Sequence, residues 1–197
     1  RDMIGAFNEY IQAMDELGYR TTYDVLNAMD FGVPQRRERV FAVSKLSGEP
    51  FNFAGVRARG KKAPHINEFL SDTYEEKHVI KAPSMLDKIP ELNPDGHKRK
   101  GYNRMLDVIE DSCWTITERQ DRCPNAGIIK LDNGHYRYLT ELEAWRLMGF
   151  GDEDYERAEK EFPTRKGYRN ATLYAMAGNS IVVPVLEAIF AELLEEY

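Results

Sequence analysis

The chain has 197 residues, 42% of them hydrophobic and 30% charged, with a formal net charge of −6 at pH 7. This composition excludes wholesale disorder, and no run of about 18 apolar residues predicts a membrane span. The acidic balance argues against nucleic-acid binding through overall charge, although a local basic surface would still serve.

The first stretch predicts a helix followed by two strands. Apolar side chains recur at helical spacing over residues 3–17, and Gly18 follows as a C-terminal cap. The β-branched and aromatic stretch 19–27 predicts a strand, and after a Gly-Val-Pro turn the stretch 39–44 predicts another. Helix, strand, loop, strand is typical of the end of an α/β sheet, and it is too little sheet to stand alone.

The residue composition of the chain changes after residue 47. Residues 48–136, here called the middle lobe, are rich in glycine, proline, asparagine and charge, and only residues 66–76 look helical. Two basic clusters lie in this lobe, at 57–62 and 97–104. We expect the middle lobe to be a separate, loop-rich unit.

Helical patterning returns in the last third of the chain. Thr140 and Glu143 predict a capping box, and Gly149 supplies the C-terminal stop of that helix. An acidic helix is predicted over 152–161. Ser180 is expected to cap the last helix, whose N-terminal N–H groups would then form a site for a carboxylate.

The stretch "GVPQRRERVF" gathers three arginines between a turn and an apolar run. Alternation along a strand puts Gln35, Arg37 and Arg39 on one face, with Arg36 and Glu38 on the other. Two interpretations are open. The arginines form surface ion pairs, or one face of the strand grips an anion or a carbonyl group.

Cysteine and histidine offer no chemistry of their own. Cys113 and Cys123 are too few for a disulfide framework, and they lack metal-ligand spacing. The four histidines show no ligand spacing either. A reducing cytoplasm is the default compartment, and no metal is expected.

Three separated blocks resemble, in order, those of the DNA (cytosine-5) methyltransferase family: "GVPQRRERVF", "RYLTELEAWRLMGF" and "AGNSIVVPVL". The stretch "INEFLSDTYEEKHVI" looks more loosely like the start of that family's target-recognition region. The family's glycine-rich cofactor motif, Pro-Cys nucleophile loop and Glu-Asn-Val segment do not occur here. The resemblance therefore implies the C-terminal part of such an enzyme, with the catalytic cysteine in a missing N-terminal half.

The resemblance also implies a fold and a division of the chain. The fold class is α/β, the tail of a Rossmann-like methyltransferase sheet joined to a loop-rich mixed α+β target-recognition domain. Residues 1–47 would end the catalytic domain and 48–136 would form the recognition lobe. Residues 137–197 would close that lobe and return to the catalytic domain.

Site roles follow from the same resemblance. Arg39 would reach O2 of a flipped cytosine, Arg37 would support the pocket or a nearby phosphate, and Gln35 would help to hold that wall. A fixed donor at O2 would stabilise the negative charge that develops when a cysteine thiolate adds to C6. Asn179 and Ser180 would line the S-adenosylmethionine pocket.

Sequence reading of double-stranded DNA would fall to the middle lobe. The candidate phosphate or base contacts are the basic side chains of its two clusters: Arg57, Arg59, Lys61, Lys62, Lys98, Arg99, Lys100 and Arg104. For any single one of them, a solvated surface charge is the commoner role. Arg137 is open to two interpretations, a structural ion pair and a DNA contact.

Three functions remain open at this point. The chain could be part of a restriction-modification methyltransferase of a bacterium or phage, inactive alone because the thiolate is elsewhere. It could be a separate DNA-binding specificity subunit of a split enzyme. It could also be a non-catalytic DNA-binding protein of the same fold. None of the three calls for a membrane partner.

Overall fold

The structure is a computed structural model that describes residues 3–94 and 105–195. The helices within these ranges are α1 (Met3–Glu16), α2 (Phe53–Ala58), α3 (Pro83–Leu86), α4 (Glu141–Arg146), α5 (Asp152–Glu161), α6 (Ala171–Asn179) and α7 (Val183–Glu195). The strands are β1 (Arg20–Asn27), β2 (Gln35–Arg36), β3 (Glu38–Lys45), β4 (Cys113–Trp114), β5 (Ile129–Lys130) and β6 (Tyr136–Arg137). Short 3₁₀ turns are η1 (Ala28–Asp30), η2 (Ile66–Phe69) and η3 (Glu76–His78).

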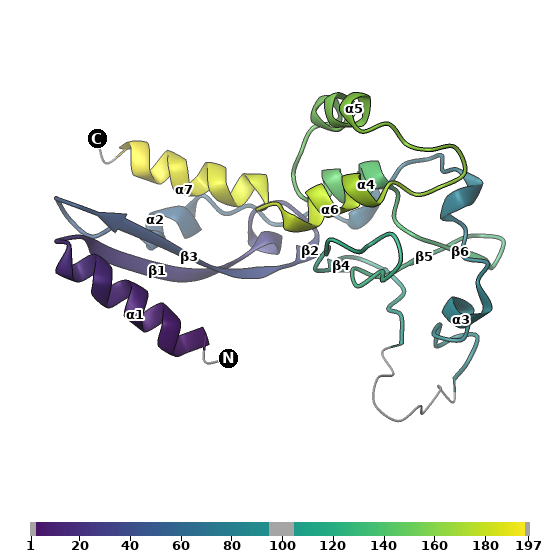
Figure 1. Ribbon diagram of the computed structural model, residues 1–197, viewed down its shortest axis with the longest axis horizontal. Coiled ribbons are helices and arrows are strands. Elements are labelled where there is room, and N and C mark those ends of the chain that lie inside the picture. Colours follow the sequence, from purple (N-terminus) through teal and green to yellow (C-terminus); the bar gives the residue numbers. More distant parts are fainter. Residues whose placement is uncertain (1–2, 95–104, 196–197) are drawn as a thin grey trace.

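Figure 1 shows an elongated molecule. One end holds the β1–β3 ribbon with α1, α2 and α7, and the other holds α4, α5, α6 and the short strands β4 to β6 (Figure 1). The described strands form three two-stranded sheets, β1–β3, β2–β4 and β5–β6. The parallel pair β2–β4 joins the arginine block to the middle lobe.

The helix and the two strands predicted at the start of the chain are confirmed. Helix α1 ends at Glu16, and Gly18 takes a left-handed φ of +85°, while the Tyr19 amide donates to Met14 O at 3.0 Å. This is the closing pattern that a glycine cap produces. Strands β1 and β3 then pair antiparallel with Val25 opposite Val40.

One face of the β1–β3 ribbon is largely uncovered. Tyr23, Val25 and Val40 lie on it with exposed fractions of 57%, 47% and 56%. Helix α1 covers part of this face, where Phe7 packs edge-to-face on Tyr23 with ring centroids 5.0 Å apart. Apolar side chains are normally buried in a sheet, so this face has room for further protein.

Helix α2 packs against β1 and α7. Its residues fall within the middle lobe expected from the sequence, but they lie at the sheet end of the molecule (Figure 1). Buried Phe53 and Val56 face the same core as Val185 of α7. The change in residue composition after residue 47 therefore does not mark a boundary between two packing units.

A single core runs through both ends of the molecule. Its members include Leu26 and Val33 near the ribbon, Leu139 and Met148 around α4, and Tyr174 of α6. A smaller, separate cluster lies mostly within the middle lobe and consists of Ile80, Ile89, Ile128, Tyr136 and Tyr138. Because the larger cluster is continuous, the arginine block and α6 are held in fixed relation.

The helix expected over 66–76 is wrong. Only the 3₁₀ turn η2 forms, and the chain then leaves helical geometry at Leu70. In a longer helix the Ser71 amide would bond to the Asn67 carbonyl, but it donates instead to the Glu143 carboxylate at 2.9 Å. A tertiary hydrogen bond to a buried charge has replaced the local one.

The capping box and the helix stop around α4 are confirmed. Thr140 Oγ1 accepts from the Glu143 amide at 3.2 Å, and the Glu143 carboxylate accepts from the Thr140 amide at 2.7 Å. Gly149 has φ +86°, and a Cβ there would overlap the ring of Pro184. Helix α5 matches the predicted 152–161.

By length and composition alone, Ala171–Glu195 is apolar enough to cross a membrane. The structure divides this stretch into α6 and α7 at Ser180, whose ψ is 163°. Leu173, Tyr174 and Val185 within it belong to the protein core. A core position explains the apolar composition of both helices.

Candidate functional site

A cleft of about 360 Å³ lies between β3 and the junction of α6 and α7. Its walls include polar and apolar side chains from both sides: Arg37, Arg39, Phe41, Asn179, Ser180 and Val182. The arginine block and the Gly-Asn-Ser block, which are 141 positions apart at Arg37 and Gly178, meet here. The structure thus brings together four of the predicted site residues.

Gln35 is fully buried and does not reach the cleft surface. Its Oε1 accepts from the Ile116 amide at 3.0 Å, and its Nε2 donates to the Leu147 carbonyl at 2.6 Å. The side chain therefore ties the arginine block to the middle lobe and to α4. Its two ends are engaged with the backbone, so it holds the wall rather than contacting a ligand.

Arg37 is 8% exposed and is held by three backbone carbonyls. Its guanidinium donates to Ile116 O at 2.8 Å, to Gly178 O at 3.1 Å and to Ser180 O at 2.9 Å. Burial, and then the nearby charge of Arg39, lower the pKa of Arg37 to about 10, so it stays charged at neutral pH. Arg37 is a fixed cation behind the cleft.

Arg39 differs from Arg37 in being exposed. Its guanidinium donates to the neighbouring Glu38 carbonyl at 2.6 Å, and no carboxylate pairs with it in the described part of the chain. It lines the same cleft as Arg37. Most of its N–H donors are therefore available to a molecule in the cleft.

Arg36 points the other way, as strand alternation requires. It is the register partner of Trp114, and its guanidinium lies 4.9 Å from the centre of the Trp114 ring. Gln35 and Arg37 are buried, whereas Arg36 and Glu38 are exposed. The alternation predicted from the sequence holds for these four positions.

The expected role of Ser180 as the cap of the last helix is wrong. Ser180 is the C-cap of α6, its hydroxyl donates to Met176 O at 2.7 Å, and α7 begins only at Val183. The cleft therefore meets the carbonyl end of α6 and also the start of α7, where Val182 and Val185 line it. Carbonyl dipoles attract a cation, which explains the position of Arg37.

Asn179 offers an open amide on this wall. It is exposed, lines the cleft and has no hydrogen-bond partner for its side chain among residues 3–94 and 105–195. Around it the lining is apolar, with Leu26, Phe41 and Val185. A single polar side chain on an apolar wall is an arrangement that fits one side of an organic cofactor. Among the described residues, no group of side chains could hold a metal ion.

Two of the four cationic side chains in the first basic cluster are neutralised within the protein. Arg57 donates to both carboxylate oxygens of Asp24, at 2.7 and 2.9 Å, and Arg59 pairs with Glu192 at 3.1 Å and with Glu195. Lys61 and Lys62 are exposed beside a second cleft, and neither has an ion pair among the described residues. The second cluster, with Lys98, Arg99, Lys100 and Arg104, lies outside the described residues.

Of its two interpretations, Arg137 takes the structural one. Its guanidinium makes a bidentate ion pair with Glu143 at 2.7 and 2.8 Å, and both side chains are buried. Glu143 also accepts from the Ser71 amide. Arg137 therefore fastens β6 to α4.

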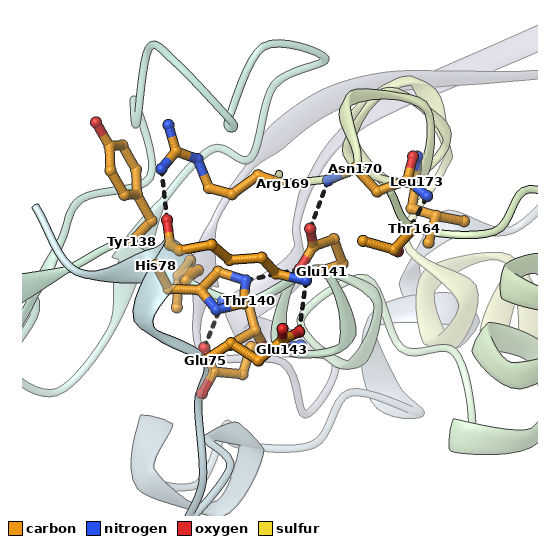
Figure 2. Close-up of polar contacts among 12 residues, drawn as sticks. Glu75, His78, Tyr138, Thr140, Glu141, Glu143, Thr164, Arg169, Asn170 and Leu173 are labelled. Carbon is orange, nitrogen blue, oxygen red and sulfur yellow. Dashed lines mark hydrogen bonds and ion pairs between the residues drawn. The ribbon is translucent and has the colours of Figure 1, made fainter. Parts of the chain in front are cut away.

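Figure 2 shows a second buried polar network that sequence reasoning missed. His78 Nε2 lies 2.8 Å from Glu141 Oε2, and the other oxygen of Glu141 accepts from the Asn170 amide at 2.6 Å. Arg169 lies over the Tyr138 ring at 4.0 Å and donates to the Lys77 carbonyl at 2.8 Å. No local pattern signals this pairing, because His78 and Glu141 are 63 positions apart.

The sequence of the whole chain matches one protein family. The description of that family is C-5 cytosine-specific DNA methylase, and the match covers residues 2–195. The chain belongs to this family. The family uses S-adenosylmethionine to methylate cytosine at C5 in DNA.

Two curated methylases illustrate the similarity. The chain is 35% identical to the type II methyltransferase M2.ScrFI of Lactococcus lactis subsp. cremoris, over 96% of this chain and 49% of that protein. It is 29% identical to the orphan methyltransferase M.SssI of Spiroplasma monobiae, over 92% of this chain and 47% of that protein. The methylase chain therefore spans about half the length of these relatives.

Solved structures share its fold at lower identity. The Dnmt2 methyltransferase of S. pombe superposes with a TM-score of 0.74 at 19% identity, over 97% of this chain and 63% of that one. The Entamoeba histolytica methyltransferase EhMeth gives 0.69 at 16% identity, over 96% and 58%. These likenesses confirm the mixed α/β fold of the methylase chain.

Proposed function

We propose that this chain is the C-terminal part of an S-adenosylmethionine-dependent DNA (cytosine-5) methyltransferase of a bacterial or phage restriction-modification system. In that enzyme it binds the target cytosine and recognises the DNA sequence around it. The observation that carries the proposal is the cleft in which Arg39, Arg37 and Asn179 meet. The sequence has no Pro-Cys motif, and the chain covers about half of its relatives, which supports a nucleophile located elsewhere.

Arg39 is the residue proposed to contact the cytosine. When a thiolate adds to C6 of the ring, negative charge develops over N3 and O2. A guanidinium donor at O2 stabilises that charge, and it does so more strongly in a cleft with apolar walls than in water. Arginine keeps its proton throughout, so it stabilises charge without taking part in proton transfer.

Arg37 and Gln35 are proposed to keep that cleft in shape. Arg37 gives three of its five guanidinium N–H donors to carbonyls, and Gln35 is held at both ends of its amide. Most of their hydrogen-bonding groups are therefore engaged within the protein. Their bonds hold the start of β3, from which Arg39 extends.

Asn179 is proposed to meet the cofactor. S-adenosylmethionine, when bound, supplies the methyl group as a sulfonium. The open amide of Asn179 can hydrogen-bond a polar group of that molecule, while Phe41 and Val182 exclude water beside it. The Ser180 hydroxyl donates to Met176, so only its lone pairs remain for a ligand.

The sheet end of the molecule is proposed to dock on the rest of the enzyme. Within the described residues, β3 pairs only with β1, and an unpaired strand edge readily accepts another strand. The exposed Val25 and Val40 beside this edge offer apolar surface to the same partner. The middle lobe would then lie across the DNA, with residues 137–197 bracing it.

The direct test is methyl transfer from labelled cofactor to double-stranded DNA. The chain is assayed alone and mixed with a polypeptide that carries the Pro-Cys half. We expect no transfer by the chain alone and transfer by the mixture. Methylation by the chain alone would overturn the assignment, because it would require a nucleophile among residues that lack the motif.

A separate specificity subunit of a split enzyme is the second candidate, favoured by the same half-length coverage. The gene sequence upstream distinguishes the two. A continuous frame with a glycine-rich motif and Pro-Cys indicates one long enzyme, whereas a start codon next to Arg1 behind a stop codon indicates a subunit.

A further inference from the structure

The connection between α5 and α6 has the opposite charge to the helix before it. Helix α5 carries six carboxylates and two cations in ten residues, whereas residues 163–169 contain three cations and no acidic side chain. This connection lies at the end of the molecule opposite the β1–β3 ribbon (Figure 1). Docking of the other half of the enzyme on the ribbon therefore does not use this surface.

A tight turn presents the cations of this connection to solvent. The Tyr168 amide donates to Arg165 O at 3.0 Å, and Gly167 takes a left-handed φ of +80°. A left-handed third residue is typical of a type II turn, which places Lys166 and Gly167 at its tip. Apart from its chain neighbours, no atom lies within 4 Å of the Cβ position at Gly167, so the tip is surrounded by open space.

The two residues that close the turn contact each other. The guanidinium carbon of Arg165 lies 4.7 Å from the centre of the Tyr168 ring, which is 58% exposed. Arg165 and Lys166 are exposed, and neither pairs with a carboxylate in the described part of the chain. The ring orients the guanidinium but leaves its N–H groups free, so both cations are available to a partner.

The base of the turn is fastened to the middle lobe. Asn170 Nδ2 donates to Thr164 Oγ1 at 3.2 Å, and these side chains lie together at the foot of the turn (Figure 2). Arg169 donates to Asp121 O and to Lys77 O, both at 2.8 Å. Because both carbonyls belong to the middle lobe, the turn is held in a fixed position on that lobe.

We propose that the turn formed by Arg165, Lys166 and Tyr168 is a surface that binds the phosphate backbone of the DNA duplex. The inference rests on the proposed function and adds a DNA contact outside the two basic clusters of the sequence. Arginine, lysine and tyrosine side chains are all usual donors to phosphate oxygens. The carboxylates of neighbouring α5 repel the same backbone, which directs the duplex toward the turn.

The test is the salt dependence of DNA binding by the assembled enzyme, the chain together with its Pro-Cys half. Fluorescence anisotropy measures the affinity for the duplex that the wild type methylates and for an unrelated duplex of equal length. Arg165→Ala/Lys166→Ala should lower the slope of log affinity against log salt by about one to two, since each phosphate contact contributes about 0.9. The fold loss of affinity should be equal on both duplexes, because phosphate contacts do not read sequence.

The matched control is Arg157→Ala/Lys160→Ala, which removes the same two kinds of cation from exposed α5. It should keep the wild-type slope, because Arg157 is already paired with Glu153 and Asp154 and the helix remains acidic. Tyr168→Ala should weaken binding about two- to fivefold at fixed salt, the scale of an exposed cation–π contact. The melting temperature of each variant, expected near the wild-type value for these exposed side chains, shows that it folds.

A wild-type slope in Arg165→Ala/Lys166→Ala would overturn the inference, and methylation of DNA by the assembled wild type would leave the proposed function standing. A loss of affinity confined to the methylated duplex would also overturn it, because such a loss indicates base reading. If the assembled wild type methylated no cytosine-containing duplex, the proposed function itself would fail.

Discussion

Neighbouring residues of the arginine block meet different surroundings, and their expected contributions differ accordingly. Arg36 lies over Trp114, Arg37 is enclosed by carbonyls, and Arg39 is open to the cleft. Charge is the same at all three positions. The orientation set by the strand and the atoms around each guanidinium distinguish a surface contact at Arg36, a support at Arg37 and the proposed base-contacting donor at Arg39.

Arg39→Ala in the assembled enzyme should lower kcat for methylation about 10²-fold or more, the scale of removing one oxyanion-type donor. The reason is that negative charge develops at O2 only in the transition state, and the variant lacks the donor that would stabilise this charge. Single-turnover methyl transfer measures it. Arg36→Ala, on the opposite face, is the control and should change kcat little. Wild-type kcat in Arg39→Ala would contradict the proposed contact between Arg39 and the base.

The buried ion pair of Arg137 and Glu143 should dominate local stability. Glu143→Ala leaves Arg137 buried without its partner, for which a loss of about 3–5 kcal/mol in the free energy of unfolding is expected. Urea unfolding measures it. Arg157→Ala removes the ion pair with Glu153, whose side chains are 75% and 86% exposed, and should cost less than about 1 kcal/mol. Equal losses would contradict the dependence on burial.

Among the elements, those with local signals were predictable. Helix α1, strands β1 and β3, the α4 capping box and helix α5 follow from periodicity and from caps within one turn. The false helix at 66–76 shows the limit. Its local pattern is helical, yet the Ser71 amide bonds to Glu143, 72 positions away, and no window of neighbours contains that competitor.

The junction of η3, α4 and α6 should weaken in acid. Burial raises the pKa of Glu141, but hydrogen bonds from His78 and Asn170 more than offset it, and the pKa ends below its ordinary value of 4.5. A lowered pKa means that the ionised group stabilises the fold above about pH 4.5, and that this stabilisation is lost as the pH falls through the folded value.

Thermal melting between neutral and strongly acid pH measures this contribution. In Glu141→Gln the decline of Tm on the acid side should be shallower than in the wild type, because one group that gains a proton on unfolding is gone. Glu153→Gln on exposed α5 should leave the wild-type slope. A parallel decline in wild type and Glu141→Gln would mean that the network does not set the acid limit.

At the scale of the whole molecule, charge location matters more than net charge. The chain is acidic overall, and carboxylates within the fold neutralise Arg57 and Arg59. Lys61 and Lys62 keep exposed charges that have no such partner within the described residues. DNA affinity of the assembled enzyme should therefore depend on the second pair more than on the first.

Salt titration of DNA binding measures this difference. Each phosphate contact contributes about 0.9 to the slope of log affinity against log salt. The double variant Lys61→Ala/Lys62→Ala should lower the slope by about one to two, and Arg59→Ala should change it less. Arg59→Ala also leaves Glu192 without its ion-pair partner. The DNA affinity of Arg59→Ala therefore serves as a second control. A flat salt dependence in the wild type would instead indicate a protein-interaction role for the lobe.

The sequence by itself determined the family resemblance, the alternation within the arginine block and most regular elements, because each depends on residues within a turn or a strand. Only the tertiary structure decided what those residues touch. Arg37 reaches Ile116 and Ser180, 79 and 143 positions away, and Ser180 ends α6 instead of starting α7. Such contacts come from packing around a shared core, and no local pattern encodes which distant carbonyl a guanidinium will meet.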